Sequence, residues 1–92
     1  MSARALDADT SLRRSLADAL GLSAARVAGF DEETPLFGAL PELDSMAVAT
    51  LLTDLEDRLD IVIDDDDIDG EIFETFGNLR AFLGRKLAAR AR

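Results

Sequence analysis

Ser45 follows an aspartate at the start of a predicted helix, in the run LPELDSMAVATLL that covers residues 40–52. A serine acts as a catalytic nucleophile only where a base lies within hydrogen-bond reach, and the whole chain contains no histidine. Asp44 is adjacent in sequence, but adjacency alone does not place it as a base. The sequence therefore predicts that the protein is not a serine hydrolase, and the absence of histidine and cysteine excludes much other enzyme chemistry.

Two non-catalytic uses of Asp44 and Ser45 remain. Either side chain can cap the helix by accepting a hydrogen bond from a free backbone N–H, a contribution of about 1 kcal/mol. A hydroxyl at a helix N-terminus is also well placed to carry an anionic group, because the free N–H groups and the helix dipole favour negative charge there. Met46 is predicted on the face opposite the core, and an adaptable apolar side chain there indicates a surface that binds several partners.

The run DDDDIDGEIFETF, residues 64–76, contains part of a calcium-binding pattern. Asp65, Asp67 and Asp69 stand at alternate positions before a glycine, as in the first half of an EF-hand loop. Position twelve of that loop requires a bidentate glutamate and is Phe76 instead, which has the character of a core residue. We therefore expect an acidic surface loop and no dedicated metal site, with weak divalent-ion binding left open as an alternative.

The spacing of apolar residues predicts an all-α protein with three longer helices and one short helix. The expected ranges are about 4–20, 44–60, 69–73 and 76–89, and no run alternates as a strand. Leucines at positions 12, 16 and 20 give the first helix one apolar face, and Gly21 marks its end. Thr75 is placed to cap the last helix.

A helical wheel of the second predicted helix separates a core face from an exposed face. The core face carries Val48, Leu52, Leu55 and Leu59, with Leu51 at its edge, and the opposite face carries Met46, Thr50, Thr53 and Asp57, with Asp54 close by. With Ile63, Phe73 and Phe82, the core-face residues are expected to line or border a core that could shelter an apolar ligand.

Residues 21–43 contain three glycines and two prolines, which predicts a long loop between the first two longer helices. Long loops in compact domains are uncommon and tend to be functional. Five apolar residues are expected to pin this loop to the core: Val27, Phe30, Leu36, Phe37 and Leu40.

Composition and charge exclude several functional classes. Ninety-two residues suit one small domain over 1–92, with 48% apolar residues, no cysteine and a formal net charge of −9. Thirteen acids and one base lie between residues 42 and 74, and such a surface repels nucleic acid while it attracts basic protein partners. No apolar run is long enough for a signal peptide or a membrane span, so we expect a cytoplasmic monomer without membrane insertion.

Asp44-Ser45-Met46, at the start of the second longer helix, resembles the Asp-Ser-Leu motif of acyl carrier proteins. The long preceding loop, the acids that follow and the later IVIDDD segment extend the resemblance over about residues 8–88. It implies a four-helix bundle that is not an enzyme and whose serine hydroxyl receives 4′-phosphopantetheine from coenzyme A, with acyl groups held as thioesters on the terminal thiol. The resemblance assigns Ser45 as the attachment site, Asp44 as the motif aspartate, and Met46, Asp54, Glu56 and Asp57 as partner contacts.

The resemblance also implies partners, namely a phosphopantetheinyl transferase and acyl ligase, synthase or acyltransferase enzymes with basic docking patches. Glu42 stands where the family usually has glycine and Thr50 where an acid is frequent, and these departures bear on which enzymes recognise the chain. The run PELDSM is similar to carriers found alongside exosortase and exopolysaccharide genes, which would pair with an adenylate-forming acyl ligase. Alternatives are a peptidyl carrier, an unmodified acidic helical adaptor and a divalent-ion-binding module, and the acidic second helix favours fatty or polyketide-type acyl cargo.

Overall fold

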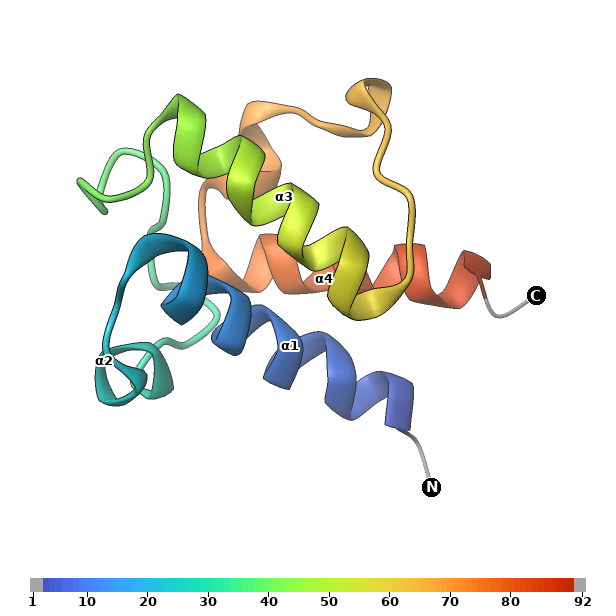
Figure 1. Ribbon diagram of the computed structural model, residues 1–92, viewed down its shortest axis with the longest axis horizontal. Helices are drawn as coiled ribbons and strands as arrows, with labels where there is room; N and C mark the ends of the chain where they lie inside the picture. Colours follow the sequence, from blue (N-terminus) through green and yellow to red (C-terminus); the bar gives the residue numbers. More distant parts are fainter. Residues whose placement is uncertain (1–2, 91–92) are drawn as a thin grey trace.

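The computed structural model describes residues 3–90, which form a helical bundle (Figure 1). The α-helices are α1 (Ala3–Leu20), α2 (Ala24–Ala28), α3 (Ser45–Leu59) and α4 (Phe76–Arg90), and the 3-10 turns η1 (Asp65–Asp67) and η2 (Gly70–Phe73) connect α3 to α4. Residues 3–90 contain no strand, and their one isolated β-bridge joins Pro35 to Thr75. The predicted all-α architecture is confirmed.

The three long helices begin and end within one residue of their expected ranges, whereas the shorter elements differ. The short helix expected over 69–73 is the 3-10 turn η2, and η1 is a separate turn before it. The prediction of an unbroken loop over 21–43 was wrong, because α2 lies inside it. Ser23 caps α2 by accepting a hydrogen bond from the Arg26 N–H at 3.1 Å, and the burial of Val27 holds this single turn against the core.

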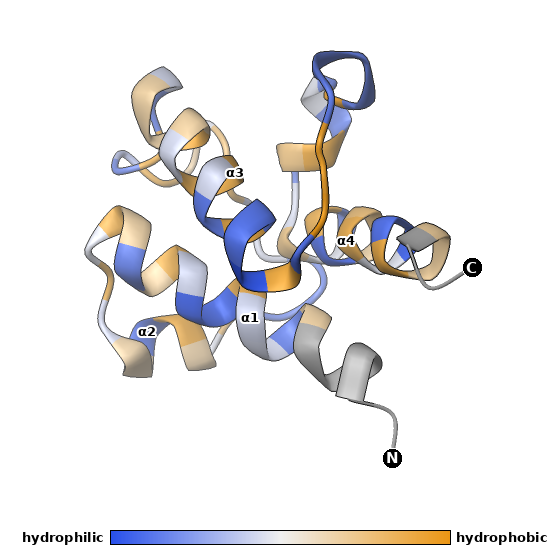
Figure 2. Cartoon of the chain, turned by 45° about the vertical axis from the view of Figure 1, so that its right-hand side comes forward, coloured by the Kyte–Doolittle hydropathy of each residue, from blue (hydrophilic) through white to orange (hydrophobic). Residues whose placement is uncertain are grey.

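The core lies between α1, α3 and α4, whose apolar faces turn toward one another (Figure 2). α1 is the central element, because it packs against both α3 and α4. The fully buried side chains of these three helices include Leu12, Leu16, Leu51, Leu55, Phe76, Leu79 and Leu83. The expected burial of Phe73 and Phe82 is confirmed as well.

The buried face of α3 is rotated from the one that the helical wheel predicted. Leu51, expected at the edge, is fully buried, whereas Val48 and Leu52 are only partly buried. The rotation follows from packing, since α3 lies mainly on α1, and this places Leu51 and Leu55 at the centre of the contact. Val48 and Leu52 therefore border the core instead of filling it.

A short backbone strap ties the loop before α3 to the start of α4. The Leu36 N–H donates to the Glu74 carbonyl at 3.0 Å, the Phe37 N–H to the Phe73 carbonyl at 2.9 Å, and the Phe76 N–H to the Thr34 carbonyl at 2.8 Å. Leu36 and Leu40 are buried as expected, but Phe37 is 55% exposed, so its predicted role as a core anchor was wrong. Its backbone is held by the strap while its side chain lies at the surface.

Two arginines fix the first part of the same loop around the buried ring of Phe76. The guanidinium carbons of Arg13 and Arg80 lie 4.5 and 5.5 Å from the centre of that ring, and both side chains form ion pairs with Asp9. Arg13 also donates to the Val27 carbonyl at 2.8 Å, which fastens α2 to α1. The hydrogen bond from Arg13, together with that from Arg80, holds the pKa of Asp9 below its ordinary value.

Gly77 lies where α4 passes close to the backbone of Glu32. A Cβ at position 77 would come within 2.7 Å of the Glu32 carbonyl oxygen, whereas one at Gly84 of the same helix would meet nothing within 4 Å. Gly77→Ala is therefore expected to lower the free energy of unfolding by about 1–3 kcal/mol, because the two segments must separate. Gly84→Ala is the control and should raise it by about 0.5–1 kcal/mol through helix propensity. Urea denaturation measures both, and a stabilising Gly77→Ala would contradict the close approach.

The first turn of α1 and the last turn of α4 lie at the end of the molecule opposite the N-terminus of α3 (Figure 1). After Leu59, the chain runs through an apolar stretch over 61–63 and then a hydrophilic turn at η1 before it reaches α4 (Figure 2). Within residues 3–90, no helix is both long enough and apolar enough to cross a membrane.

Candidate functional site

The hydroxyl of Ser45, at the start of α3, has no hydrogen-bond partner in the part of the chain that the structure describes. Asp44 is the N-cap residue, and its Oδ1 accepts a hydrogen bond from the Ala47 N–H at 2.8 Å. Ser45 is the first helical residue, is exposed, and its hydroxyl forms no hydrogen bond among residues 3–90. The capping role therefore belongs to Asp44, and the serine oxygen remains available to form a covalent bond.

The same helix end is suited to a covalently attached phosphate. The N–H groups of Ser45 and Met46 belong to the first turn, where helix geometry provides no intrahelical acceptor. These N–H groups and the positive end of the dipole of a 15-residue helix stabilise negative charge at this point. The cap does not compete for them, because the Asp44 carboxylate is bonded to Ala47.

A mainly apolar groove with a volume of about 370 Å³ begins at Ser45. Its apolar walls are Phe37, Val48, Ile68 and Phe73, and Asp69 and Gly70 complete the lining. The walls come from three places in the chain: the loop before α3, α3 itself, and the segment around η2. The volume lies within the range of small-molecule sites, so an apolar chain attached near Ser45 could leave water by entering this groove.

Sequence reasoning found part of this groove. Val48 and Phe73 were expected to border the core, but Phe37 was assigned to the core and Ile68 was not considered. The sequence signal for Phe37 was the glycine that follows it. Gly38 has a φ of 91°, so the chain turns sharply directly after Phe37. Such a turn can direct an aromatic side chain away from the core and toward a site.

The four residues expected to contact partners separate into two pairs. Met46 is 81% exposed and Asp57 is exposed, and both face solvent on α3 as predicted. Asp54 and Glu56, in contrast, have partners inside the molecule. Asp54 Oδ2 accepts hydrogen bonds from the buried Ser15 hydroxyl and from Arg58 at 2.8 Å, and the Glu56 carboxylate accepts from the Ile63 N–H at 2.7 Å.

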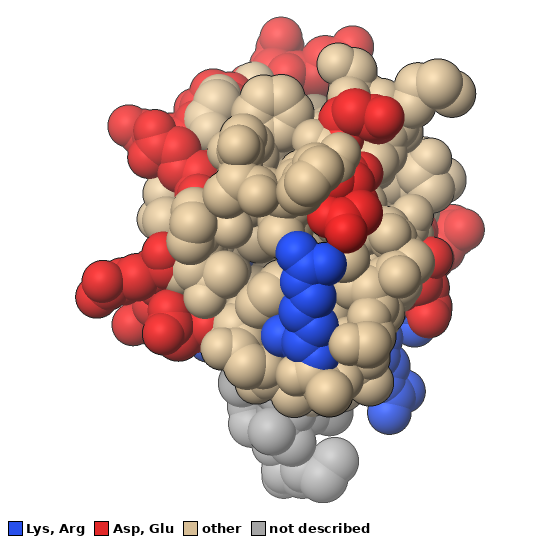
Figure 3. All heavy atoms as spheres, turned by 90° about the vertical axis from the view of Figure 1, so that its left-hand side faces the viewer, with Lys and Arg blue, Asp and Glu red and all other residues tan. Residues whose placement is uncertain are grey.

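The outward face of α3 combines small uncharged side chains with carboxylates. A shallow hollow there is lined by three small side chains and two carboxylates: Ala49, Thr50, Thr53, Asp54 and Asp57. On the face that carries the N-terminus of α3, acidic side chains lie around broad uncharged areas, and a cluster of basic side chains lies among them (Figure 3). A partner that contacts α3 beside Ser45 therefore meets the exposed Met46 first, then small side chains, and two carboxylates further along the helix.

The contacts of Asp54 make the stability of the fold depend on pH. Partial burial opposes its charge, but hydrogen bonds from Ser15 and Arg58 outweigh burial and lower the pKa of Asp54 below its ordinary value of 3.8. The pKa values of Asp9 and Asp67 are lowered too. A lowered folded-state pKa means that the unfolded chain binds more protons, so this stabilisation is complete above about pH 4 and is lost as the pH falls through the folded-state values.

Thermal unfolding followed between pH 7 and pH 3 should therefore show a Tm that falls below about pH 4. Asp54→Asn should have a lower Tm at pH 7. Its Tm should also fall less on acidification, because one of the carboxylates that become protonated is gone. An equal fall in this variant and in the unchanged protein would show that Asp54 does not contribute.

The acidic run over 64–76 forms no recognisable metal site in the part of the chain that the structure describes. No group of three or more carboxylates is arranged there to hold an ion. Phe76, at the position where an EF-hand needs glutamate, is fully buried as expected. Asp64 and Asp69 instead cap the turns η1 and η2.

The sequence profile of the family described as "Phosphopantetheine attachment site" matches residues 10–84, most of the chain. The chain belongs to this carrier-protein family. Among solved structures, a holo acyl carrier protein from Nitrosomonas europaea, determined by solution NMR, is 39% identical. The match covers 89% of this chain and 96% of that chain, with a TM-score of 0.79. A search of curated proteins found no significant match.

Membership of the acyl carrier proteins explains why the described residues hold a free hydroxyl and a groove and show no catalytic group beside them. Proteins of this family are carriers and are not themselves catalytic. Their prosthetic group is a covalently attached 4′-phosphopantetheine.

Proposed function

We propose that Ser45 is the attachment residue and that this carrier protein, one domain over residues 1–92, presents acyl groups as thioesters to partner enzymes. The observation that carries the proposal is the division of roles at the start of α3. Asp44 caps the helix, which leaves the Ser45 hydroxyl exposed, unbonded within residues 3–90, and at the mouth of an apolar groove.

Loading requires a phosphopantetheinyl transferase and coenzyme A. The serine oxygen forms a bond to the phosphorus next to pantetheine, the pyrophosphate P–O bond of coenzyme A breaks, and the nucleotide leaves while the transferase removes the serine proton. The new phosphodiester keeps a negative charge at the N-terminus of α3, where the N–H groups of Ser45 and Met46 can stabilise it. Asp44 contributes by holding this turn in place.

The apolar groove supports acyl over peptidyl cargo. Phe37, Val48, Ile68 and Phe73 offer an apolar chain contact in an open groove of about 370 Å³, whereas a polar peptide would leave its amides without partners among these side chains. A fatty or polyketide-type acyl group is therefore the preferred cargo, supplied by an acyl ligase, synthase or acyltransferase.

Partner recognition is proposed to centre on Met46 and Asp57. Both are exposed on α3 within a few turns of Ser45, and Met46 offers adaptable apolar contact to several enzymes. Asp54 and Glu56 add negative charge to this region while their oxygens are held by internal contacts. The net charge of −9 should also speed the encounter with basic docking patches, an effect that salt weakens.

The direct test is the intact mass of the protein after incubation with coenzyme A and a broad-specificity transferase. A gain equal to one 4′-phosphopantetheine group is expected, and an unchanged mass would contradict the proposal. The residue that carries the group is then decided by the variants considered in the Discussion.

A further inference from the structure

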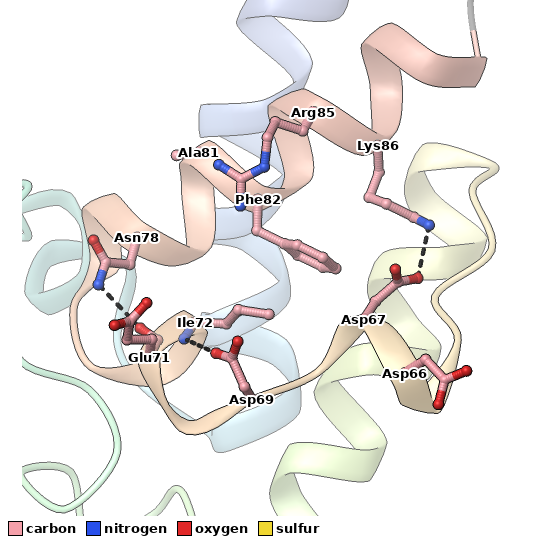
Figure 4. A pocket seen from close by; sticks show the side chains of 10 residues that line it. All are labelled: Asp66, Asp67, Asp69, Glu71, Ile72, Asn78, Ala81, Phe82, Arg85 and Lys86. Atoms are coloured by element: carbon pink, nitrogen blue, oxygen red, sulfur yellow. Dashed lines mark hydrogen bonds and ion pairs between the residues drawn. The ribbon is translucent and has the colours of Figure 1, made fainter.

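The segment 64–72 separates two hollows. On one side, Ile68, Asp69 and Gly70 form a wall of the groove beside Ser45. On the other side, a second hollow of about 570 Å³ lies between the segment and α4. Figure 4 shows Asp67, Asp69 and Ile72 along one side of this hollow and Phe82 and Lys86 of α4 on the other. Because Asp69 borders both spaces, a displacement of the segment into the second hollow would change the groove.

The two ends of this segment are held differently. At its C-terminal end, Ile72 and Phe73 of η2 are buried, and Asn78 of α4 donates to the Glu71 carbonyl at 3.0 Å. At its N-terminal end, η1 has no buried residue. Within the described chain, its side chains form one ion pair to the rest of the fold, from Lys86 Nζ of α4 to Asp67 Oδ2 at 2.8 Å.

The Lys86–Asp67 ion pair joins α4 to the internal geometry of η1. The same Asp67 Oδ2 also accepts a hydrogen bond from the Asp64 N–H at 3.0 Å, which closes the turn. The side chains of Lys86 and Asp67 are 23% and 32% exposed, so water screens the pair only in part. One carboxylate oxygen therefore fixes both the shape of η1 and its distance from α4.

We propose that Lys86 is a positioning residue for the cargo: through Asp67 it holds the segment that forms the wall of the groove beside Ser45. The proposal rests on the proposed function, because the groove must shelter an acyl chain for its wall to matter. Without the ion pair, the segment is no longer held at this distance from α4, so it can shift, and an acyl chain in the groove becomes more accessible to water. Lys86 thus acts on cargo attached at a residue on another helix.

The first test uses the protein without its prosthetic group. Hydrogen exchange is measured at the amides of Asp67 and Ile68, which donate to the Asp64 and Asp65 carbonyls within η1. Lys86→Gln should accelerate their exchange about two- to five-fold, the range expected from loss of a partly exposed ion pair. Arg85→Gln is the matched control: it removes the same charge one residue earlier, where the described residues form no ion pair.

The second test measures cargo protection in the loaded protein. Thioester hydrolysis adds one water to the carbonyl carbon, breaks the C–S bond, and yields a carboxylic acid and the free thiol. Lys86→Gln should hydrolyse an octanoyl thioester about two- to five-fold faster than the unchanged protein, and an acetyl thioester at the same rate, because two carbons do not reach into the groove. Arg85→Gln should leave both hydrolysis rates unchanged. Lys86→Arg keeps the cation, so its octanoyl thioester should hydrolyse at the rate of the unchanged protein.

Three outcomes would overturn the proposal. These are equal exchange in Lys86→Gln and Arg85→Gln, faster exchange throughout α1 as well as η1, and equal acceleration of acetyl and octanoyl hydrolysis. Failure of the proposed function is distinguishable from all of these, since the protein would then gain no mass with coenzyme A. The exchange experiment, which needs no prosthetic group, would still decide whether Lys86 holds η1.

Discussion

Ser45→Ala is expected to abolish the mass gain with coenzyme A and transferase completely. The substitution removes the oxygen that we propose accepts the phosphopantetheine group, and helix α3 should still form because its cap is Asp44. The free energy of unfolding should therefore change by less than about 0.5 kcal/mol, as is usual for an exposed residue without structural contacts. Loss of loading with an unchanged stability would separate the chemical role of the hydroxyl from any structural role.

Ser23→Ala is the matched control for this experiment. Ser23 is also an exposed serine at a helix start, where its hydroxyl caps α2 by accepting from the Arg26 N–H. The variant should lose up to about 1 kcal/mol of stability from the missing cap and should load as fully as the unchanged protein. A mass gain that persists in Ser45→Ala, or disappears in Ser23→Ala, would move the attachment site elsewhere.

Leu55→Ala should produce the largest loss of stability among the variants considered. The Leu55 side chain is fully buried where α3 packs on α1, so its truncation removes apolar contact and leaves a cavity. The expected loss is about 2–5 kcal/mol, a large part of the stability of a small domain. Urea denaturation monitored by circular dichroism measures the change.

Leu52→Ala tests which face of α3 is buried. Leu52 is only partly buried, so its truncation should lower the free energy of unfolding by about 1 kcal/mol, well below the effect at Leu55. A helix oriented as the wheel predicted would make the two losses similar. Equal losses would therefore contradict the observed orientation of α3.

The difference between the predicted and observed faces of α3 shows where sequence information ends. Leu55 and Leu59 belong to both faces, and the choice between adding Leu51 or adding Val48 and Leu52 depends on which helix lies alongside. Apolar spacing defines an amphipathic helix but not its neighbour, so the long helices could be placed to within a residue while the rotation of α3 could not.

Prediction of the candidate site from the sequence was limited in the same way. Asp44 and Ser45 are both good capping residues, and the sequence alone could not tell which one would be left with a free side chain. Asp54 looked available to partners because its contact with Ser15 joins residues 39 positions apart. The motif predicts the attachment residue, whereas the walls of the groove and the acids that already have internal partners depend on contacts distant in sequence.

The arrangement of the ends has a consequence for engineered assemblies. The start of α1 and the end of α4 lie away from the end of the molecule where Ser45 stands (Figure 1). A linker fused at either end would leave the reactive end unobstructed, so a tethered enzyme could reach it as an intramolecular partner. A flexible linker matched to the span would raise the effective concentration to the millimolar range and could replace a weak docking surface.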